Sequence, residues 1–227
     1  KNVGITNVSI TGKNYTGGLV GQANSGNITN SYATGKVSGN NYHVGGLVGR
    51  AYNSDITNSY AIGDVTGGIN NVGGLVGHAN SGNITNSYAT GKVTGNRNSG
   101  GLVGGAFSNN ITNSYATGKV TGTSNVGGLV GVAYNSDITN SYATGAVDGN
   151  DNYVGGLVGG AYNGSDITNS YATGDVTGGI NNVGGLVGDA DNNSDITNSY
   201  YTDTTGQAGT GTATTIQNLA AALPTGF

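Results

Sequence analysis

A five-residue block repeats along this chain and constrains its fold more than any other feature. Gly-Gly-Leu-Val-Gly begins at seven places, 27 to 29 residues apart: Gly17, Gly45, Gly73, Gly100, Gly127, Gly155 and Gly184. A second block, Ile-Thr-Asn-Ser-Tyr, begins 11 or 12 residues after each of them, at Ile28, Ile56, Ile84, Ile111, Ile138, Ile167 and Ile196, and residues 5–12 are a degenerate eighth copy. This period predicts an array in which each unit buries its apolar face only by stacking on its neighbours.

The composition of the repeat favours strands over helices. Thr, Val, Ile, Tyr and Gly dominate it, and 46 of the 227 residues are glycine, whereas the best helix formers are scarce. A propeller blade usually has about 40 residues or more, so this repeat is too short for one. We therefore expect an all-β chain folded as a parallel β-helix, or β-solenoid, with seven to eight coils of about 28 residues, spaced about 4.8 Å apart. We expect two or three short strands in each coil.

The variable positions predict which side chains face solvent. The position of Lys36 holds Lys, Asp or Ala in successive repeats, whereas the next position, that of Val37, is always Val. Lys36 should therefore point outward and Val37 inward. Because side chains alternate along a strand, Ser31 and Ala33 should also point inward and Tyr32 outward.

Two breaks in this alternation are expected. Strict alternation would turn Val20 outward next to an inward Leu19, so we favour a glycine-dependent bulge that turns Val20 inward; an exposed valine ladder is the alternative. Ile28 should point inward, which requires a bend at Thr29-Asn30. Asn tolerates turn geometry, and its side-chain amides can bond from coil to coil, so an asparagine ladder is predicted at Asn30 and its equivalents.

The sequence resembles a known repeat family. Residues 1–201 are similar to the GLUG repeat. The resemblance lies in Gly18-Leu19-Val20-Gly21 and its six copies, in the second block that follows each, and in the Val-Thr-Gly that ends the repeat. Such repeats occur in large bacterial surface and secreted proteins, including haemagglutinin-like adhesins and some surface peptidases. The resemblance implies an extracellular or cell-surface location, in a bacterium or an archaeon, and a scaffold or adhesive role. It supplies no catalytic residues.

Residues 202–227 form a separate segment that resembles the end of such arrays. A short helix is expected at residues 214–223, with a threonine N-cap, three apolar residues on one face and Pro224 at its end. This helix should cap the last coil. Lys1 starts within the repeat pattern and follows no signal sequence, so we expect the chain to be a processed piece of a longer protein.

No catalytic or metal site is expected. The chain has no Cys and no Glu, and it lacks the motifs of phosphate loops, serine hydrolases and zinc peptidases. Its aspartates mostly share repeat positions with Asn, which indicates turns. His43 and His78 are interpreted as separate surface residues. We expect no enzymatic activity and no cofactor; the oxygen ligands of residues 148–151 leave Ca²⁺ binding there as an alternative.

The outward columns are the candidate binding surface for a cell-surface glycan or protein, since aromatic and polar side chains bind such partners. The candidates are Tyr32, Tyr60, Tyr88, Tyr115, Tyr142, Tyr171, Thr34, Thr90, Thr117, Thr144 and Thr173. If these residues only stabilise the stacked coils, the columns have no ligand. We expect neither nucleic-acid binding nor membrane insertion, because no stretch approaches the length and apolarity of a membrane span.

Two other functions remain open. If the alternation were reversed, a flat uncharged face would result, which resembles those of ice-binding solenoids. That face would contain Thr29, Thr57, Thr85, Thr112, Thr139, Thr168, Ser31, Ser59, Ser87, Ser114, Ser141 and Ser170. The third hypothesis is a head-to-tail filament. All seven Lys and Arg lie at or before Lys119, whereas nine of the eleven aspartates follow it, so a rod would carry opposite charges at its two ends.

Overall fold

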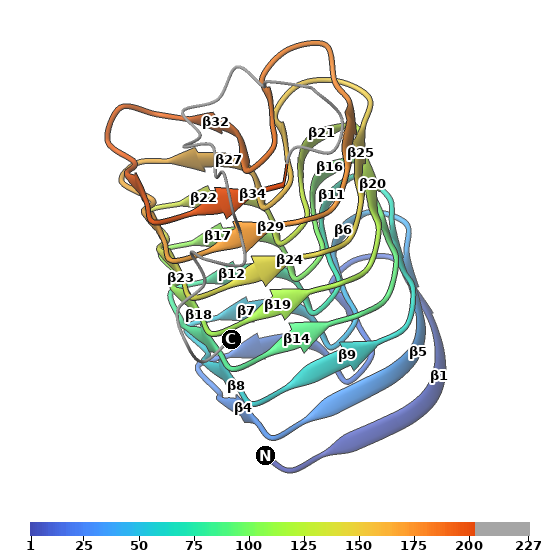
Figure 1. The fold of residues 1–227 in the computed structure, drawn as a ribbon. Coiled ribbons are helices and arrows are strands. Elements are labelled where there is room, and N and C mark those ends of the chain that lie inside the picture. Colours follow the sequence, from blue (N-terminus) through green and yellow to red (C-terminus); the bar gives the residue numbers. More distant parts are fainter. Residues whose placement is uncertain (203–227) are drawn as a thin grey trace.

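The computed structural model describes residues 1–202, which wind into a parallel β-solenoid of about seven coils, with one repeat in each coil (Figure 1). The predicted fold class is confirmed. No helix occurs among the described residues. The helix expected at residues 214–223, and the segment boundary placed after residue 201, fall in or next to the part of the chain that the structure does not describe.

Four parallel sheets run along the solenoid, each built from equivalent strands of successive coils. Sheet A contains β1 (Gly4–Gly12), β5 (Tyr32–Gly39), β9 (Tyr60–Ile62), β10 (Val65–Gly67), β14 (Tyr88–Ala89), β15 (Val93–Thr94), β19 (Tyr115–Ala116), β20 (Val120–Gly122), β24 (Tyr142–Ala143), β25 (Val147–Gly149), β29 (Tyr171–Ala172), β30 (Val176–Gly178) and β34 (Tyr200–Tyr201). Sheet B contains β2 (Thr16–Gly17), β6 (Tyr42–Gly45), β11 (Asn70–Gly73), β16 (Arg97–Gly100), β21 (Ser124–Gly127), β26 (Val154–Gly155) and β31 (Val183–Gly184).

The other two sheets complete each coil. Sheet C contains β3 (Val20–Asn24), β7 (Val48–Tyr52), β12 (Val76–Asn80), β17 (Val103–Phe107), β22 (Val130–Tyr134), β27 (Val158–Tyr162) and β32 (Val187–Ala190). Sheet D contains β4 (Ile28–Thr29), β8 (Ile56–Thr57), β13 (Ile84–Thr85), β18 (Ile111–Thr112), β23 (Ile138–Thr139), β28 (Ile167–Thr168) and β33 (Ile196–Thr197). Identical positions pair in register, for example Ile56 with Ile84 and Tyr60 with Tyr88.

Each coil contains more strands, and shorter ones, than we expected. One coil runs through β9, β10, β11, β12 and β13, so five short strands replace the two or three predicted from the sequence. Residues in left-handed conformation separate them: Asn58 has φ 49° and Gly63 has φ 136°. Asn and Gly adopt positive φ at little cost, so these residues bend the chain and end the strands.

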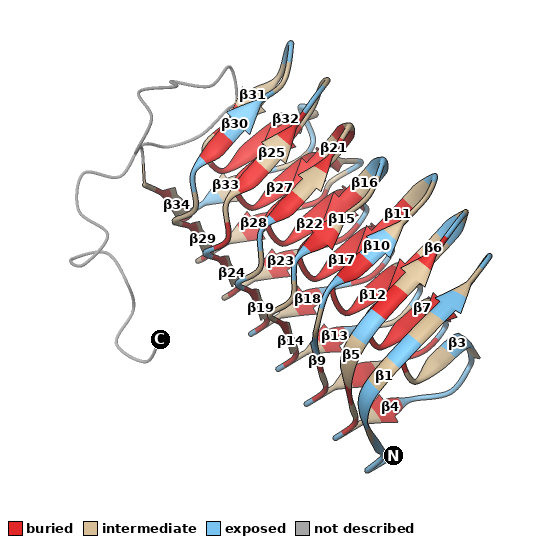
Figure 2. Ribbon diagram, turned by 90° about the vertical axis from the view of Figure 1, so that its right-hand side faces the viewer, coloured by how far each residue is buried: buried red, intermediate tan, exposed pale blue. Residues whose placement is uncertain are grey.

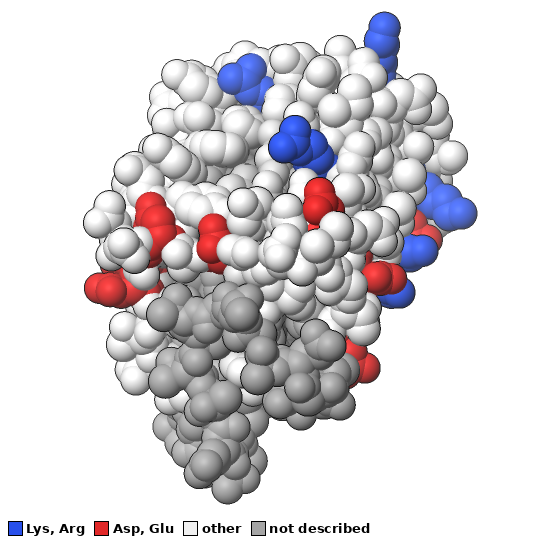
Figure 3. All heavy atoms as spheres, turned by 90° about the horizontal axis from the view of Figure 1, so that it is seen from above, with Lys and Arg blue, Asp and Glu red and all other residues white. Residues whose placement is uncertain are grey.

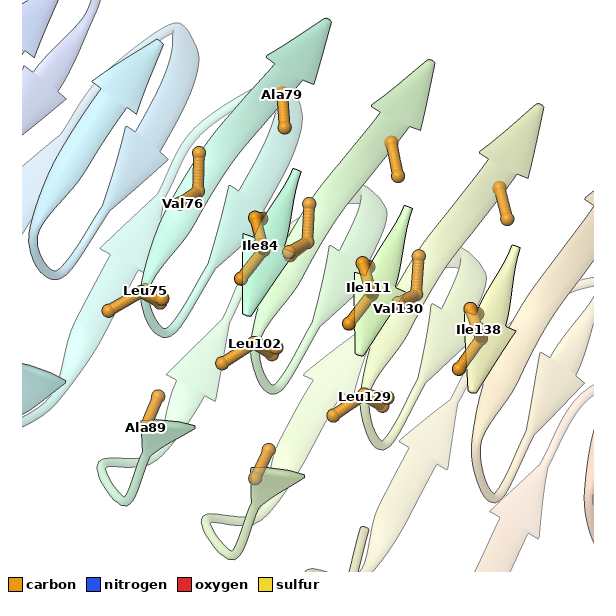
Figure 4. Packing of buried hydrophobic residues seen from close by; sticks show 14 of the residues in the cluster. Leu75, Val76, Ala79, Ile84, Ala89, Leu102, Ile111, Leu129, Val130 and Ile138 are labelled. Carbon is orange, nitrogen blue, oxygen red and sulfur yellow. The ribbon is translucent and has the colours of Figure 1, made fainter. Parts of the chain in front are cut away.

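The interior holds two apolar cores made of stacked columns. The larger core takes a Leu, a Val, two Ala and an Ile from each coil, as Figure 4 shows for Leu75, Val76, Ala79, Ile84 and Ala89. The smaller core stacks the valines of sheets A and B, such as Val65 on β10 and Val72 on β11. All of these side chains are buried. The predicted inward direction of Ser31, Ala33 and Val37 is confirmed.

The paired glycines mark places where neighbouring backbones leave no room for a side chain. A Cβ atom at Gly46 would collide with the carbonyl oxygen of Gly74 in the next coil and lie 2.9 Å from Cβ of Ala61. Gly45 and Gly46 do not have positive φ. Close approach of the coils therefore requires glycine at this pair, whereas Gly35 and Gly63 combine close approach with positive φ.

The inward direction predicted for Val20 is confirmed, but it arises at a bend before the strand and not at a bulge, because the paired strands keep their register. In the second full coil the N–H groups of Leu47 and Val48 both donate to the carbonyl oxygen of Leu75, at 2.9 and 3.0 Å. The pairing of β7 with β12 then passes from Val48 directly to Arg50. Two successive side chains, Leu47 and Val48, thus point inward, and both are fully buried.

Two polar ladders close the bends on either side of Tyr32 and its equivalents. In the asparagine ladder, Nδ2 of Asn58 donates to Oδ1 of Asn30, and Asn86 repeats the bond to Asn58. In the buried serine ladder, Ser59 Oγ donates to the carbonyl oxygen of Thr57 and accepts the N–H of Ser31. The predicted asparagine ladder is thus confirmed over these coils, and buried backbone groups at the bend are satisfied.

The first coil is less buried than the central coils. Figure 2 shows β1 and β3 mostly in the exposed and intermediate colours, whereas β17, β22 and β27 are mostly buried. A hollow of about 200 Å³ at this end is lined by Val3, Leu19, Val20, Ile28, Ser31 and Lys1. No helix long and apolar enough to cross a bilayer is found in residues 1–202.

Candidate functional site

The predicted tyrosine column forms a continuous ladder on sheet A. The rings of Tyr32, Tyr60, Tyr88, Tyr115, Tyr142 and Tyr171 stack face to face, with centroids 4.8–4.9 Å apart and planes within 2–4° of parallel. Both faces of each inner ring are covered by its two neighbours, so the column offers solvent its ring edges and hydroxyl groups. Burial, followed by the charge of a neighbouring phenolate, raises the pKa of Tyr115 above its ordinary value.

The predicted threonine column lies two residues after each tyrosine, within β5 at Thr34 and just after the strand in the later coils. Thr34 is half-buried, Thr117 and Thr144 are exposed, and Ile62 interrupts the column in the second full coil, where it pairs with Thr34. The tyrosine edges and threonine hydroxyls therefore form two parallel polar columns that repeat at the coil spacing. This surface has little depth, and it provides many equivalent weak contacts.

The structure does not form the alternative ice face. Its serine half, Ser31 and the five equivalents, is buried in the serine ladder, with exposed fractions of 0–2%. Each of these hydroxyls already bonds to backbone, as Ser87 Oγ does to the carbonyl oxygen of Thr85 at 2.9 Å. Only the threonine half remains at the surface, where Thr29, Thr57 and their equivalents are mostly half-buried.

The aspartates of the Asn/Asp column have bonds to backbone that explain their positions. Asn83 N–H donates to Oδ1 of Asp55, and Asp55 N–H donates in turn to Oδ1 of Asn27. Asp137, Asp166 and their neighbours repeat the pattern. These bonds fit the turn interpretation. Within residues 1–202, no group of three or more His, Cys, Asp or Glu could hold a metal ion.

A cluster between sheets B and C is the part of the surface that sequence reasoning missed. It consists of Tyr15, His43, Arg50, Tyr52, Asn71 and His78, and we call it the Arg50 cluster. The rings of His43 and His78 lie 4.7 Å apart, and His43 stacks on Tyr15 at 5.4 Å. The guanidinium carbon of Arg50 lies 5.9 Å from the ring centre of Tyr15 and 5.5 Å from that of Tyr52. The two histidines are therefore not separate surface residues.

Asn71 sets the protonation of both imidazoles. Its Oδ1 accepts a bond from Nδ2 of Asn98, at 2.8 Å, so its own Nδ2 points to Nδ1 of His43, at 3.1 Å, and to Nδ1 of His78, at 3.3 Å. Each Nδ1 is thus an acceptor, and each Nε2 carries the proton. Burial, and then the nearby Arg50 charge, lowers the pKa of His43 to about 4; burial, His43 and Arg50 lower the pKa of His78 to about 4.

The C-terminal end of the same face has the opposite charge. Tyr162 Oη donates to Asp189 at 3.0 Å, and Asn182 Nδ2 donates to the other oxygen of Asp189 at 2.8 Å. Burial and the bond to Asp189 raise the pKa of Tyr162. Asp189 and Arg50 occupy the same repeat position in different coils: Arg50 follows Val44 by six residues, and Asp189 follows Val183 by six. One repeat position therefore carries a cation near one end and an anion near the other.

Charges elsewhere rarely pair. Among the described residues, the single ion pair within 4.0 Å joins Lys119 to Asp148, at 3.4 Å. Figure 3 shows basic side chains in the upper half and at the right, where acidic side chains lie among them, and acidic side chains without a basic neighbour at the left. Asp64 uses Oδ1 to accept the backbone N–H of Lys92. The uneven charge seen in the sequence therefore persists at the surface.

Comparison with known proteins identifies the repeat. A family model described as the GLUG motif matches six segments, residues 12–38, 40–66, 68–94, 95–121, 122–148 and 150–177. Searches of the curated proteins and of the solved structures gave no match. The six segments cover most of the chain, and each corresponds to one coil of the solenoid. The chain belongs to the GLUG-motif repeat family.

Proposed function

We propose that this chain is a non-catalytic structural and adhesive module of a bacterial or archaeal surface or secreted protein, and that it binds a cell-surface glycan or protein along sheet A. The observation that carries the proposal is the uninterrupted ladder of six tyrosines, whose rings repeat every 4.8–4.9 Å. A rigid row of identical groups suits a ligand that is itself repetitive, since many weak contacts then act together.

The stacking geometry narrows how such a ligand would bind. Because each ring face is covered by the next ring, sugars cannot lie flat on the column. They would instead bond to the tyrosine hydroxyls and to the threonines of the neighbouring column, such as Thr117 and Thr144. The absence of catalysis is supported by the Asn/Asp column, whose carboxylates accept backbone N–H groups.

Binding to a panel of glycans and to intact cells tests the proposal. We expect the double variant Thr117→Asp/Thr144→Asp to weaken binding, because it places charge in the threonine column. The control is Ser108→Asp, which adds charge at an exposed position at the end of sheet C. Binding that is unchanged by the double variant would argue against sheet A as the adhesive face. Labelling of intact and lysed cells of the source organism tests the surface location.

Head-to-tail assembly is a second candidate. The hollow at the N-terminal end is largely apolar and includes Lys1, whereas the hollow at the other end is lined by Asp191 and Asp195. A contact between such unlike ends can propagate into a filament. Light scattering against ionic strength tests it, and association that is insensitive to salt would exclude an electrostatic contact.

Ice binding is disfavoured, because the serines of the flat face are inside. The purified protein should therefore show neither thermal hysteresis nor shaping of ice crystals. Measurable hysteresis would contradict this expectation.

A further inference from the structure

The Arg50 cluster holds a positive charge that no described residue neutralises. Arg50 is half-buried, its Nε is buried without a hydrogen-bond partner, and no carboxylate of residues 1–202 lies within ion-pair distance of it. The rings of Tyr15 and Tyr52 hold the guanidinium in place instead. A fixed guanidinium offers parallel N–H groups that match the two oxygens of a carboxylate.

The residues around Arg50 add donors and no negative charge. His43 and His78 each direct Nδ1 at Asn71, so each Nε2–H is available to donate. Among residues 1–202, the hydrogen bonds of the two imidazoles are those of their Nδ1 atoms. The groups that surround the guanidinium are thus two neutral imidazoles, two tyrosines and an amide. Such a set suits a ligand that contributes only acceptors.

The cluster also offers aromatic surface that the tyrosine ladder does not. Tyr52 is 45% exposed and Tyr15 is 39% exposed. In sheet C, Tyr52 pairs with Asn24 on one side and Asn80 on the other, so no aromatic ring of a neighbouring coil stacks on it. Arg50 lies over the ring, and a ligand beside the guanidinium can contact the exposed part of it. A ligand with an apolar face would gain from this contact.

Tyr15, His43 and Asn71 occupy the same repeat position, and the backbone conformation there is unfavourable for Tyr and His. The column has positive φ in every coil and is Asn at Asn71, Asn98, Asn125 and Asn182, but Tyr15, His43 and Tyr153 occupy the other coils. Tyr15 has φ 49° and His43 has φ 57°. Left-handed conformation is unfavourable for a bulky residue, and such strain concentrates at functional sites. The side chains of Tyr15 and His43 therefore contribute something that asparagine does not.

We propose that the Arg50 cluster binds a uronic acid unit of an acidic polysaccharide. The carboxylate would accept from the Arg50 guanidinium, the ring hydroxyls would accept from Nε2–H of His43 and His78, and the apolar face of the sugar would lie against Tyr52. The equivalents of Arg50 in the other coils are Gln22, His78, Gly105, Val132, Gly160 and Asp189. Each chain therefore has one such site. It is separate from the sheet A columns of the proposed function.

Calorimetry with the purified chain tests this site, using tetragalacturonate as the ligand and its methyl ester as the uncharged match. We expect one site per chain for the acid and no measurable binding of the ester. Arg50→Gln should weaken binding about tenfold or more, since it removes the charged anchor. Arg97→Gln removes the same charge from an exposed position on sheet B, and it should leave affinity unchanged within about twofold.

A second pair of variants covers the case in which Arg50→Gln fails to fold. Tyr52→Ala removes an exposed ring from the cluster, and Tyr134→Ala removes an equally exposed ring at the equivalent position three coils further. Only Tyr52→Ala should weaken binding. Equal binding of acid and ester, equal losses from Arg50→Gln and Arg97→Gln, or no binding of the acid would overturn the proposal. Tetra-aspartate binding as tightly as the sugar would overturn the assignment to a saccharide. None of these results depends on sheet A.

Discussion

The glycine pair before each leucine gives the sharpest test of how the coils pack. Gly101 lies in the middle of the solenoid, where a Cβ would collide with the carbonyl oxygen of Gly128 and lie 2.8 Å from Cβ of Ala116. Neither neighbour is a flexible side chain that can move aside. Gly101→Ala should therefore force the backbones of adjacent coils apart.

The expected cost follows from this collision. Overpacking a buried site costs about 1–3 kcal/mol, and contact with a backbone oxygen places Gly101→Ala at the upper end. The loss of chain entropy in the unfolded state offsets about 0.4–1 kcal/mol. The net destabilisation should be about 2 kcal/mol, which lowers the Tm of a chain this long by about 4–8 °C.

Gly26→Ala is the matched control. Gly26 is exposed, its φ is not positive, and a Cβ there would meet only the Asn24 carbonyl oxygen at 3.9 Å. This variant should leave Tm unchanged or raise it slightly. Thermal unfolding followed by circular dichroism compares the two, and exchange of the Leu102 amide, bonded to Leu129 at 2.8 Å, reports the local effect. A Gly101→Ala protein as stable as the control would refute the close-approach explanation.

Three further predictions follow from the ladders and the histidines. Ser114→Ala removes the acceptor of the Ser87 N–H and the donor to Thr112, so unfolding experiments in denaturant should show a loss of about 1–3 kcal/mol, whereas Ser9→Ala at an exposed strand position without positive φ should change stability by less than about 0.5 kcal/mol. Asn86 has φ 50°, so Asn86→Ala should be about 1–2 kcal/mol less stable than Asn86→Gly, and equal stabilities would show that the bend is not strained. The pKa values of His43 and His78 are lowered from 6.5 to about 4, so the unfolded chain binds more protons than the folded chain between these pH values. The free energy of unfolding should therefore fall as pH falls from 6.5 to 4, and His78→Gln should reduce that fall. A pH profile that His78→Gln leaves unchanged would contradict the neutral state of the two histidines.

Much of the fold could be predicted because the repeat supplies its own comparison. Six copies show that Val37 and its equivalents never change while Lys36 does, and this difference alone separates inside from outside. The inward turn of Val20 was predicted from its glycine neighbours. The number of strands was not, because the left-handed conformation of Asn58 and its equivalents divides each coil at a point that strand propensity does not mark.

The Arg50 cluster could not be found by comparing equivalent positions. His43 and His78 lie 35 residues apart and occupy different repeat positions, so they do not share a column. A signal was nevertheless present: His43 lies one coil before Asn71, and Asn71 precedes His78 by seven residues on the adjacent strand of the same coil. To use it, one must know that sheets B and C bring these side chains together, which is a property of the folded coil.

The reason for the paired glycines also lay beyond the sequence. Positive φ and lack of space both favour glycine, and a run of invariant glycines cannot distinguish them. The structure shows that lack of space alone requires glycine at Gly46, whose φ is not positive, whereas Gly35 combines φ 120° with a backbone neighbour that leaves no room for a Cβ.

Distances between spin labels test the central claim, that each repeat forms one coil in register with the next. The chain has no cysteine, so two introduced cysteines label it specifically. Lys36→Cys and Asp175→Cys place labels at equivalent positions five coils apart, and the strand spacing predicts about 24 Å between their Cα atoms. Asp64→Cys with Asp175→Cys should give about 19 Å. Distances that shorten by roughly 5 Å for each coil removed would support the account. Distances that do not scale with the number of coils would contradict it.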